Sequence, residues 1–359
     1  MGAGLSRKKI KLSDIARAAN VSISTVSRII NRNADVSPEL RDRVQDAALK
    51  LGVNLSDRNK AKTIVFLLGN RDMLHPFHSR VLLGAEAYCA KHGYSTLFLS
   101  FQYPASVPWS DLALPAVLEG RQDVSGIIVG GTNSLNLLEL LSRKRMAFAV
   151  LGNNILGEWP QEQYDTVWFD DIRSAYEATR YLQSLGHRAI YFVGNCQRPW
   201  ISRCYEGYRM AMVEASLPPR VSAVDADQEQ EVGYLGTKSV LAGTEPVSAI
   251  LAGDDATAQG AYRAVRDYGL RIPGDISLAS LGETDNHTLD PPLTTIQEFP
   301  EQVGMQLATL VLNRIAQPDL VPLKCVVPTR LIKRASCCPP RLPVENSGQA
   351  DARFAHFGS

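Results

Sequence analysis

The chain has 359 residues, of which 45% are hydrophobic and 21% charged, and its formal net charge is +1. This length suggests two or three domains, and the composition is ordinary for a globular protein with a sizeable core. No apolar run approaches the roughly 18 residues of a transmembrane helix, and Arg7 to Lys9 are not followed by the apolar segment of a signal peptide. We therefore expect a cytoplasmic protein with no membrane partner.

Charge is distributed unevenly along the chain. Residues 1–62 hold 13 Lys and Arg against 6 Asp and Glu, whereas the remaining residues hold 25 against 31. A basic segment attached to an acidic body is the electrostatic pattern of a protein that binds nucleic acid at one end. We therefore looked for a DNA-binding unit near the N-terminus.

Residues 12–31 are predicted to form two short helices joined by a tight turn. Ser13 is expected to cap the first helix and Ser22, at the end of the turn, the second. Apolar residues of the second helix recur at the spacing of one buried face: Val26, Ile29 and Ile30. Its opposite face carries small polar side chains and one arginine: Ser24, Thr25, Ser27 and Arg28. This pattern predicts a helix-turn-helix, with a helical hairpin that packs on another protein as the alternative.

The polar face of the second helix suits the floor of the DNA major groove. We expect Arg28 to pair bidentately with guanine, with a contact to phosphate alone as the alternative. Ser24 and Thr25 suit either a base or a phosphate, whereas Ile23 offers only an apolar contact, for instance to a thymine methyl group. The predicted DNA-binding residues are Ser13, Ser22, Ile23, Ser24, Thr25, Ser27, Arg28, Asn31 and Leu55.

A third helix should begin at Ser37-Pro38, where serine caps the helix and proline occupies its first turn, and should end at Gly52. Residues 1–52 then form an all-α headpiece. The polar and charged residues 53–62 are expected to be a short linker, in which Leu55 is the one apolar side chain suited to insertion between base pairs.

From Thr63 onward, strand and helix patterns alternate. The continuous apolar run over 64–68 is typical of a buried parallel strand. Further strands are predicted at 97–99, 126–130, 146–151, 189–193, 247–252 and 276–281. Helices are predicted at 77–92, 111–119, 134–143, 174–185, 203–215, 256–268 and 301–316. This alternation predicts an α/β domain over residues 63–336 with two doubly wound parallel sheets, followed by a disordered tail at 337–359.

A ligand site is expected outside the carboxyl ends of the strands, as in other doubly wound sheets. His75, Phe77 and His78 follow the first strand of this domain, Trp200 and Arg203 lead into a helix, and Asp255 ends a strand. Together they supply aromatic surface, a cation and a carboxylate, which suit a polyol or a small acid. The alternatives are that Phe77 and Trp200 belong to the core, that the histidines are solvated, and that Asp255 only caps the following helix.

No motif favours catalysis or a cofactor. The chain has no GxSxG, no GxGxxG after a strand and no P-loop. Its six cysteines lack metal-binding spacing and are expected to be reduced, and His75 and His78 have no Cys or carboxylate cluster beside them. We expect neither a metal nor a cofactor, and we interpret the chain as a non-enzyme; a cytoplasmic small-molecule-binding protein or an enzyme on the same α/β fold is the alternative.

The headpiece sequence resembles a known family. The run Asp14-Ile-Ala, Val21-Ser and Thr25-Val-Ser-Arg-Ile-Ile-Asn31 is similar to the DNA-binding headpiece of the lactose-repressor (LacI-type) family. The resemblance continues to about residue 336, through Ser125-Gly-Ile-Ile128, Leu185-Gly-His-Arg188, Gly253-Asp-Asp255 and Leu289-Asp-Pro-Pro. It implies a transcriptional regulator, acting as a repressor, that binds double-stranded operator DNA as a homodimer. It also implies a sugar-like effector held between two lobes that resemble periplasmic binding proteins.

The chain departs from this family at three places. The family's Tyr-x-Pro-Asn run and hinge helix after the third helix are missing here. Cys204 stands where the family often has an arginine, three residues before Gly207. Gly282 stands where the family tends to have a ligand-contacting aspartate, which leaves Glu283 or Asp285 as the nearby carboxylate. The predicted effector-binding residues are His75, Phe77, His78, Trp200, Arg203, Asp255 and Glu283.

The short linker predicts weak bending of the operator. A minor-groove wedge needs a segment that folds against its dimer mate, yet six of the ten residues in 53–62 are Asn, Asp, Lys or Arg, and ordering them buries little apolar area. We therefore expect weak operator bending in a circular-permutation assay. In a parallel affinity measurement, Leu55→Ala should change operator affinity little. A strong central kink that disappears in this variant would contradict the prediction.

Overall fold

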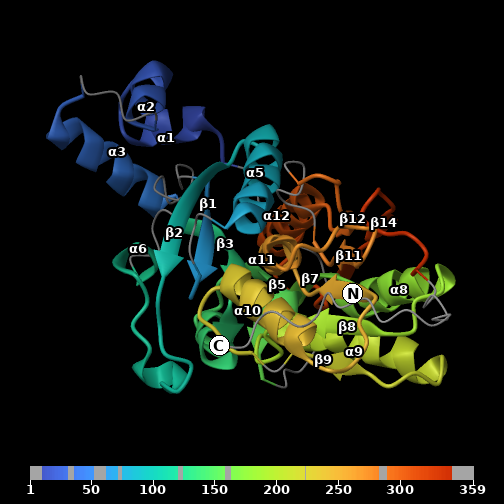
Figure 1. Ribbon diagram of the computed structural model, residues 1–359. Helices are drawn as coiled ribbons and strands as arrows, with labels where there is room; N and C mark the ends of the chain where they lie inside the picture. The colour runs from blue at the N-terminus through green and yellow to red at the C-terminus, as the bar shows by residue number, and fades with distance from the viewer. Residues whose placement is uncertain are drawn as a thin grey trace, which may run out of the picture.

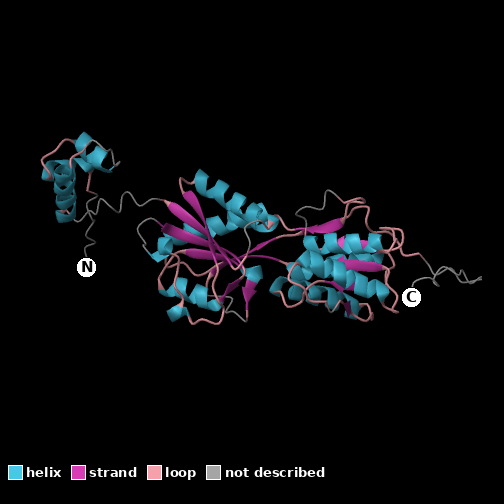
Figure 2. Ribbon diagram, turned by 60° about the vertical axis from the view of Figure 1, so that its left-hand side comes forward, coloured by secondary structure: helices cyan, strands magenta, loops and turns pink. Residues whose placement is uncertain are grey.

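The computed structural model describes residues 10–30, 36–51, 62–71, 75–119, 124–157, 163–222, 224–282 and 289–341. Three groups of elements are visible in Figure 2: a small helical headpiece and two α/β lobes that lie side by side. The predicted linker falls outside the described residues, except for Lys62. No helix in the described ranges is long and apolar enough to span a membrane.

The headpiece consists of α1 (Leu12–Ala18), α2 (Ile23–Ile30) and α3 (Pro38–Lys50), as predicted. Ile15, Val26 and Val44 are fully buried at its centre. Ser22 caps α2, because its Oγ accepts a hydrogen bond from the Thr25 backbone N–H at 3.1 Å.

The prediction that Ser13 caps the first helix is wrong. Helix α1 begins at Leu12, and Lys11 is the residue at its N-cap. The Asp14 carboxylate turns back and accepts a hydrogen bond from the Lys11 backbone N–H at 2.8 Å, so that the helix starts before the serine. Ser13 therefore lies inside the first turn of the helix.

The first lobe contains a six-stranded parallel sheet in the order β13-β7-β5-β3-β1-β2. Its strands are β1 (Thr63–Gly69), β2 (Ser95–Phe101), β3 (Val124–Gly131), β5 (Phe148–Leu151), β7 (Asp165–Phe169) and β13 (Lys324–Val327). Helices α5 (Pro76–Lys91) and α12 (Pro300–Ala316), which lie side by side in Figure 1, cover one face, and α6 (Ala116–Glu119) and α7 (Leu135–Arg143) cover the other. Two short strands of this lobe, β4 (Asn133–Ser134) and β6 (Ile155–Leu156), form a separate two-stranded parallel sheet.

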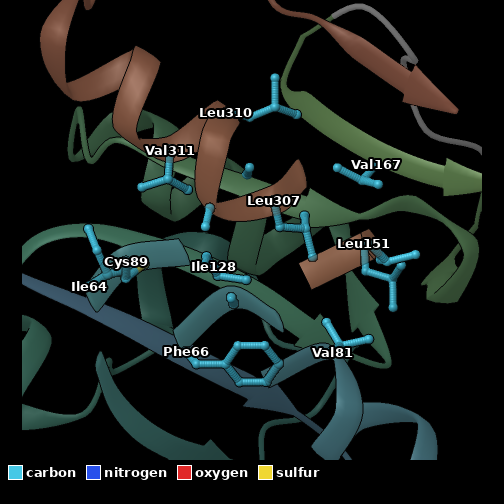
Figure 3. Close-up of a cluster of buried hydrophobic side chains, with 14 of the residues drawn as sticks. Ile64, Phe66, Val81, Cys89, Ile128, Leu151, Val167, Leu307, Leu310 and Val311 are labelled. Atoms are coloured by element: carbon cyan, nitrogen blue, oxygen red, sulfur yellow. The ribbon is translucent and has the colours of Figure 1, made fainter. Parts of the chain in front are cut away.

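The core of the first lobe joins segments that are far apart in the chain. Figure 3 shows side chains of β1 and β3, such as Phe66 and Ile128, packed with Val81 of α5 and Leu307 of α12. Helices α5 and α12 approach so closely that a Cβ at Gly84 would lie 2.0 Å from the Glu301 carbonyl oxygen. Only glycine permits this contact between the two helix backbones.

The second lobe contains a six-stranded sheet in the order β14-β12-β11-β10-β8-β9. Its strands are β8 (Ile190–Val193), β9 (Arg220–Val221), β10 (Ala249–Ala252), β11 (Ser277–Ser280), β12 (Thr294–Gln297) and β14 (Arg330–Ile332). Helices α8 (Asp171–Ser184) and α9 (Pro199–Glu214) cover one face, and α10 (Glu229–Ala242) and α11 (Asp255–Asp267) cover the other. The predicted fold class is confirmed, although the edge strand β14 runs antiparallel to β12.

The chain passes between the lobes three times. It leaves the first lobe after β7, returns to it between β12 and α12, and leaves again between β13 and β14. The strands next to these crossings lie at one edge of each sheet: β13 and β7 in the first lobe, β14 and β12 in the second. Movement of the lobes about these segments is the expected hinge motion of such a fold.

Several sequence-based assignments differ from the structure. Of the helix predicted at 111–119, only residues 116–119 form α6, because the residue before Pro115 is kept out of the α-helical region. Helix α10 was not predicted because its Gly233 and Gly236 weaken the helical pattern. Gly233 is needed there, since a Cβ would lie 2.0 Å from the Thr257 carbonyl oxygen of α11. The short strands β7, β9, β12, β13 and β14 were also missed.

The packed domain extends beyond the predicted boundary at 336. The Cys338 backbone N–H donates to Ser277 Oγ at 3.1 Å, and Arg341 pairs with Asp275 at 3.1 Å. The first residues of the predicted tail are therefore ordered on the second lobe, and residues 342–359 fall outside the described part. The six cysteines are free thiols, as expected.

Candidate DNA-binding face and ligand pocket

Helix α2 presents its predicted polar face outward. Ile23 is 54% exposed, Ser24 and Arg28 are exposed, and Val26 and Ile29 on the opposite side are buried in the headpiece core. Thr25 and Ser27 are half-buried. Two further residues of the predicted set, Asn31 and Leu55, lie outside the described residues.

A hydroxyl cluster orders the start of α2. Ser22 Oγ lies 2.7 Å from both Ser24 Oγ and Thr25 Oγ1, in addition to capping the helix. These short side chains are therefore held in place by one another before any partner binds. Among the exposed side chains that the structure describes in α2, Ile23 and Arg28 lie outside this cluster.

A pocket of about 260 Å³ lies between the two lobes. The first lobe contributes Arg71, His75, Pro76, Phe77, His78, Asn154 and Phe169 to its wall. The second lobe contributes Asp171, Trp200, Cys204, Gly253, Asp254, Asp255, Ala256, Gln259, Leu281 and Gly282, and Glu298 lies in the crossing between β12 and α12. The structure thus brings together five of the predicted effector residues: His75, Phe77, His78, Trp200 and Asp255.

The other two predicted effector residues are not in the pocket wall. Glu283 lies outside the described residues. Arg203 points elsewhere: its Nε donates to Asp171 Oδ2 at 2.8 Å, and a second guanidinium nitrogen donates to the Asn153 carbonyl oxygen. Its assignment as a lining residue is therefore wrong, because a buried carboxylate on the neighbouring helix captures the guanidinium. Arg203 instead fixes the position of Asp171, which does line the pocket.

Carboxyl groups dominate the second-lobe side of the pocket. Asp254, not Asp255, caps α11, accepting from the Thr257 backbone N–H at 2.8 Å, and burial raises its pKa to about 6. Asp255 Oδ1 instead accepts a hydrogen bond from Ser280 Oγ at 3.2 Å. Burial, together with the charges of the neighbouring aspartates, raises the pKa of Glu298 well above its ordinary value. Burial also raises the pKa of Asp171, although Arg203 opposes this.

The two histidines face the pocket from the first-lobe side. Neither is solvated, since His75 is half-buried and His78 is only 3% exposed. Burial lowers the pKa of both imidazoles, and for His78 the lowering is large, so we expect both rings to be neutral near pH 7. The buried Nδ1 atoms of both rings have no hydrogen-bond partner among the described residues.

Aromatic rings complete the wall, and a cation spans the pocket. Phe77 belongs to both the core and the pocket, with its ring centroid 5.7 Å from that of Phe169. The Arg71 guanidinium lies 4.1 Å from the Trp200 ring centroid, and Arg71 Nη1 lies 3.2 Å from Glu229 Oε1. Burial lowers the pKa of Arg71.

Several pocket residues were missed by sequence reasoning, above all Arg71, Asp171 and Glu298. Arg71 lies two residues after β1, so its place at a strand end was a usable signal. Glu298 follows β12, a strand too short to be predicted. The pocket can hold a small ligand through carboxylate oxygens, neutral imidazoles and aromatic faces. Burial raises the pKa of the Cys204 thiol well above its ordinary value, which disfavours the thiolate form.

Comparison with known proteins identifies both parts of the chain. Residues 11–53 match the model of bacterial regulatory proteins of the lacI family, and residues 179–337 match a periplasmic binding protein-like domain. The ribose operon repressor of Haemophilus influenzae is 28% identical over 318 residues, which cover 86% of this chain and 92% of that protein.

Solved structures agree with this assignment. A LacI family transcriptional regulator from Enterococcus faecium with bound ribose has a TM-score of 0.66 and 27% identity, covering 78% of this chain and 100% of that one. The lac repressor dimer bound to operator and an anti-inducer shares the fold, with a TM-score of 0.67 at 21% identity over 92% of this chain and 100% of that one. The chain therefore belongs to the lacI family of DNA-binding bacterial transcriptional regulators.

Proposed function

We propose that this protein is a transcriptional repressor of the bacterial cytoplasm that binds operator DNA as a homodimer. Its operator affinity is set by a small, uncharged polyol of about one sugar ring, bound between the lobes. The observation that carries this proposal is the interlobe pocket, in which aromatic rings and carboxylate oxygens converge in a chain that also has a helix-turn-helix headpiece.

The size of the pocket argues for a small ligand. Its volume of about 260 Å³ lies just below the range of about 300–1,000 Å³ that is usual for drug-sized ligands. A single sugar ring fits this scale. The related Enterococcus faecium regulator, whose structure contains ribose, supports the same class of ligand.

The charge of the pocket argues against an anionic ligand. Asp254 and Asp255 line it as carboxylates, and Asp171 pairs with Arg203. Arg71, the one arginine among the described lining residues, already pairs with Glu229. Carboxylates accept hydrogen bonds from hydroxyl groups, and Phe77, Phe169 and Trp200 offer apolar faces to the C–H side of a sugar ring. The small acid that the sequence left open is therefore disfavoured in comparison with a neutral polyol.

Movement of the lobes about the three crossing segments couples ligand binding in the pocket to DNA binding by the headpieces. A ligand that contacts both lobes favours their closed arrangement, and closure changes the separation of the two headpieces in a dimer. The two half-sites of an operator lie at a fixed spacing, so operator affinity follows the lobe arrangement.

Ligand binding should depend on Asp255. We expect a neutral sugar from a panel of pentoses and hexoses to raise the melting temperature of the full chain, because a ligand at 100 times its Kd stabilises by about 2.7 kcal/mol. Asp255→Asn should abolish most of this shift. Glu177→Gln, which removes an exposed carboxylate in the same lobe, is the matched control and should keep it. A shift produced only by sugar acids or sugar phosphates would contradict the proposed ligand class.

Arg28 should carry base specificity. Arg28→Ala is expected to cost about 1–3 kcal/mol of operator binding and to relax the preference at one base position per half-site, because a bidentate pair with guanine is lost. Lys11→Ala should instead weaken binding uniformly across sequences and reduce its salt dependence. Binding to a library of operator variants at two salt concentrations separates the two effects. A uniform loss for Arg28→Ala would mean that this arginine contacts only phosphate.

Asp254 should make the protein less stable at high pH. Its pKa in the folded protein is raised from 3.8 to about 6, so the folded state binds more protons than the unfolded state between these values. The free energy of unfolding therefore falls as the pH rises through this window. Asparagine caps a helix as well as aspartate does but carries no charge. Asp254→Asn should raise the free energy of unfolding at pH 8 by up to about 3 kcal/mol, and by less at pH 5. Urea unfolding at both pH values tests this, and an equal gain at both would refute it.

A further inference from the structure

We propose that Arg71 controls the closure of the two lobes and reads an acceptor atom of the ligand. Arg71 extends from the end of β1 in the first lobe, whereas its partners Trp200 and Glu229 belong to the second. We call these three residues the interlobe clasp. The ligand-reading role rests on the proposed function, and the closure role does not.

The first step of the argument is the strength of the clasp. The Arg71 guanidinium lies 4.1 Å from the Trp200 ring centroid and also reaches Glu229 Oε1 at 3.2 Å. The side chains of Arg71 and Glu229 are only 15% and 20% exposed, so water and salt screen this ion pair much less than one at the surface. A cation that is partly desolvated over an indole ring gains more than one in free solution.

The second step is the place of the clasp. The chain crosses between the lobes beside β7 and β13 in the first sheet, and beside β12 and β14 in the second. Arg71 follows β1, which β5 and β3 separate from β7, and Trp200 lies beyond β8, which β11 and β10 separate from β12. The clasp therefore joins the lobes on the side of the pocket away from the crossings. A contact at that distance from a hinge resists opening with a longer lever arm than a contact beside the crossings.

The third step concerns polar atoms that closure leaves unpaired. Arg71 Nε, His75 Nδ1 and His78 Nδ1 are buried without hydrogen-bond partners among the described residues, and all three side chains line the pocket from the first lobe. Buried polar groups of this kind are normally satisfied. An oxygen of the ligand placed beside Arg71 Nε would accept its N–H, while ligand hydroxyl groups donate to Asp255 across the pocket. Closure is thus held by the clasp and completed by the ligand.

The experiment measures lobe closure in the full chain without any sugar. Small-angle X-ray scattering should give a larger radius of gyration for Arg71→Met, which keeps a long side chain but loses the charge, than for wild type. Glu229→Gln removes the ion pair from the other lobe, leaves Arg71 in place and should give a smaller increase. Arg143→Met is the matched control, because it removes an Arg–Glu pair of 2.9 Å and a contact of 4.1 Å to the Trp109 ring centroid that both lie within the first lobe, and it should leave the radius unchanged.

A second measurement guards against a folding defect. Removal of Arg71 should change the tryptophan emission of the full chain, and the same removal in a Trp200→Phe background should not, because the affected indole is then missing. Radii of gyration equal to wild type for both Arg71→Met and Glu229→Gln would overturn the closure role, whatever ligand the protein binds.

The ligand-reading role is tested with D-ribose and D-glucose as probes. The affinity for the sugar that shifts the melting temperature of wild type should fall by about tenfold or more in Arg71→Met. This loss should exceed the loss in Glu229→Gln. Equal affinities of the two variants would overturn this role. If neither these two sugars nor any other sugar of the pentose and hexose panel shifts wild type, the ligand-reading role fails together with the proposed ligand class, whereas the scattering result still decides the closure role.

Discussion

The close packing of α12 on α5 is the contact on which the arrangement of the lobes depends. The two helix backbones meet at Gly84 and Gly304, and Arg80 pairs with Glu301 beside them. Helix α12 follows β12, a strand of the second lobe, so its burial in the first lobe forces the chain to cross between them. Glu298 lies in this crossing and thereby becomes part of the pocket wall. A single helix contact thus builds a core, a hinge segment and one side of the ligand site.

The pocket wall withdraws four titratable groups from water, and the two imidazoles among them have an Nδ1 atom without a hydrogen-bond partner among the described residues. The carboxyl groups of Asp254 and Glu298 have raised pKa values, and the imidazoles of His75 and His78 have lowered ones, because all four are withdrawn from water. Burial of such groups reduces stability unless a partner satisfies them. Each lobe has two buried apolar clusters, and their burial offsets the stability that is lost by burying these polar groups.

The two walls of the pocket differ in the hydrogen bonds that they offer. The second-lobe side presents carboxylate oxygens, which accept, while the first-lobe side presents nitrogen atoms of Arg71 and the two histidines. A ligand with hydroxyl groups serves both walls, since a hydroxyl donates and accepts. A bound polyol therefore joins the lobes by its own chemistry, which is the property that a ligand-controlled hinge requires.

Local signals in the sequence were enough for the headpiece and for the order of most elements. The capping Ser22, the apolar stripe of α2 and the proline at the start of α3 all act within a few residues, so the sequence alone determined them. Five pocket residues were also predictable, because the carboxyl ends of parallel strands converge at one edge of a sheet. Only the tertiary structure decided that Asp171 captures Arg203, that Arg71 spans the lobes and that Glu298 enters the pocket. The Asp171–Arg203 and Arg71–Glu229 contacts join residues that are 32 and 158 positions apart, and no local pattern records a pairing that forms only when separate segments pack together.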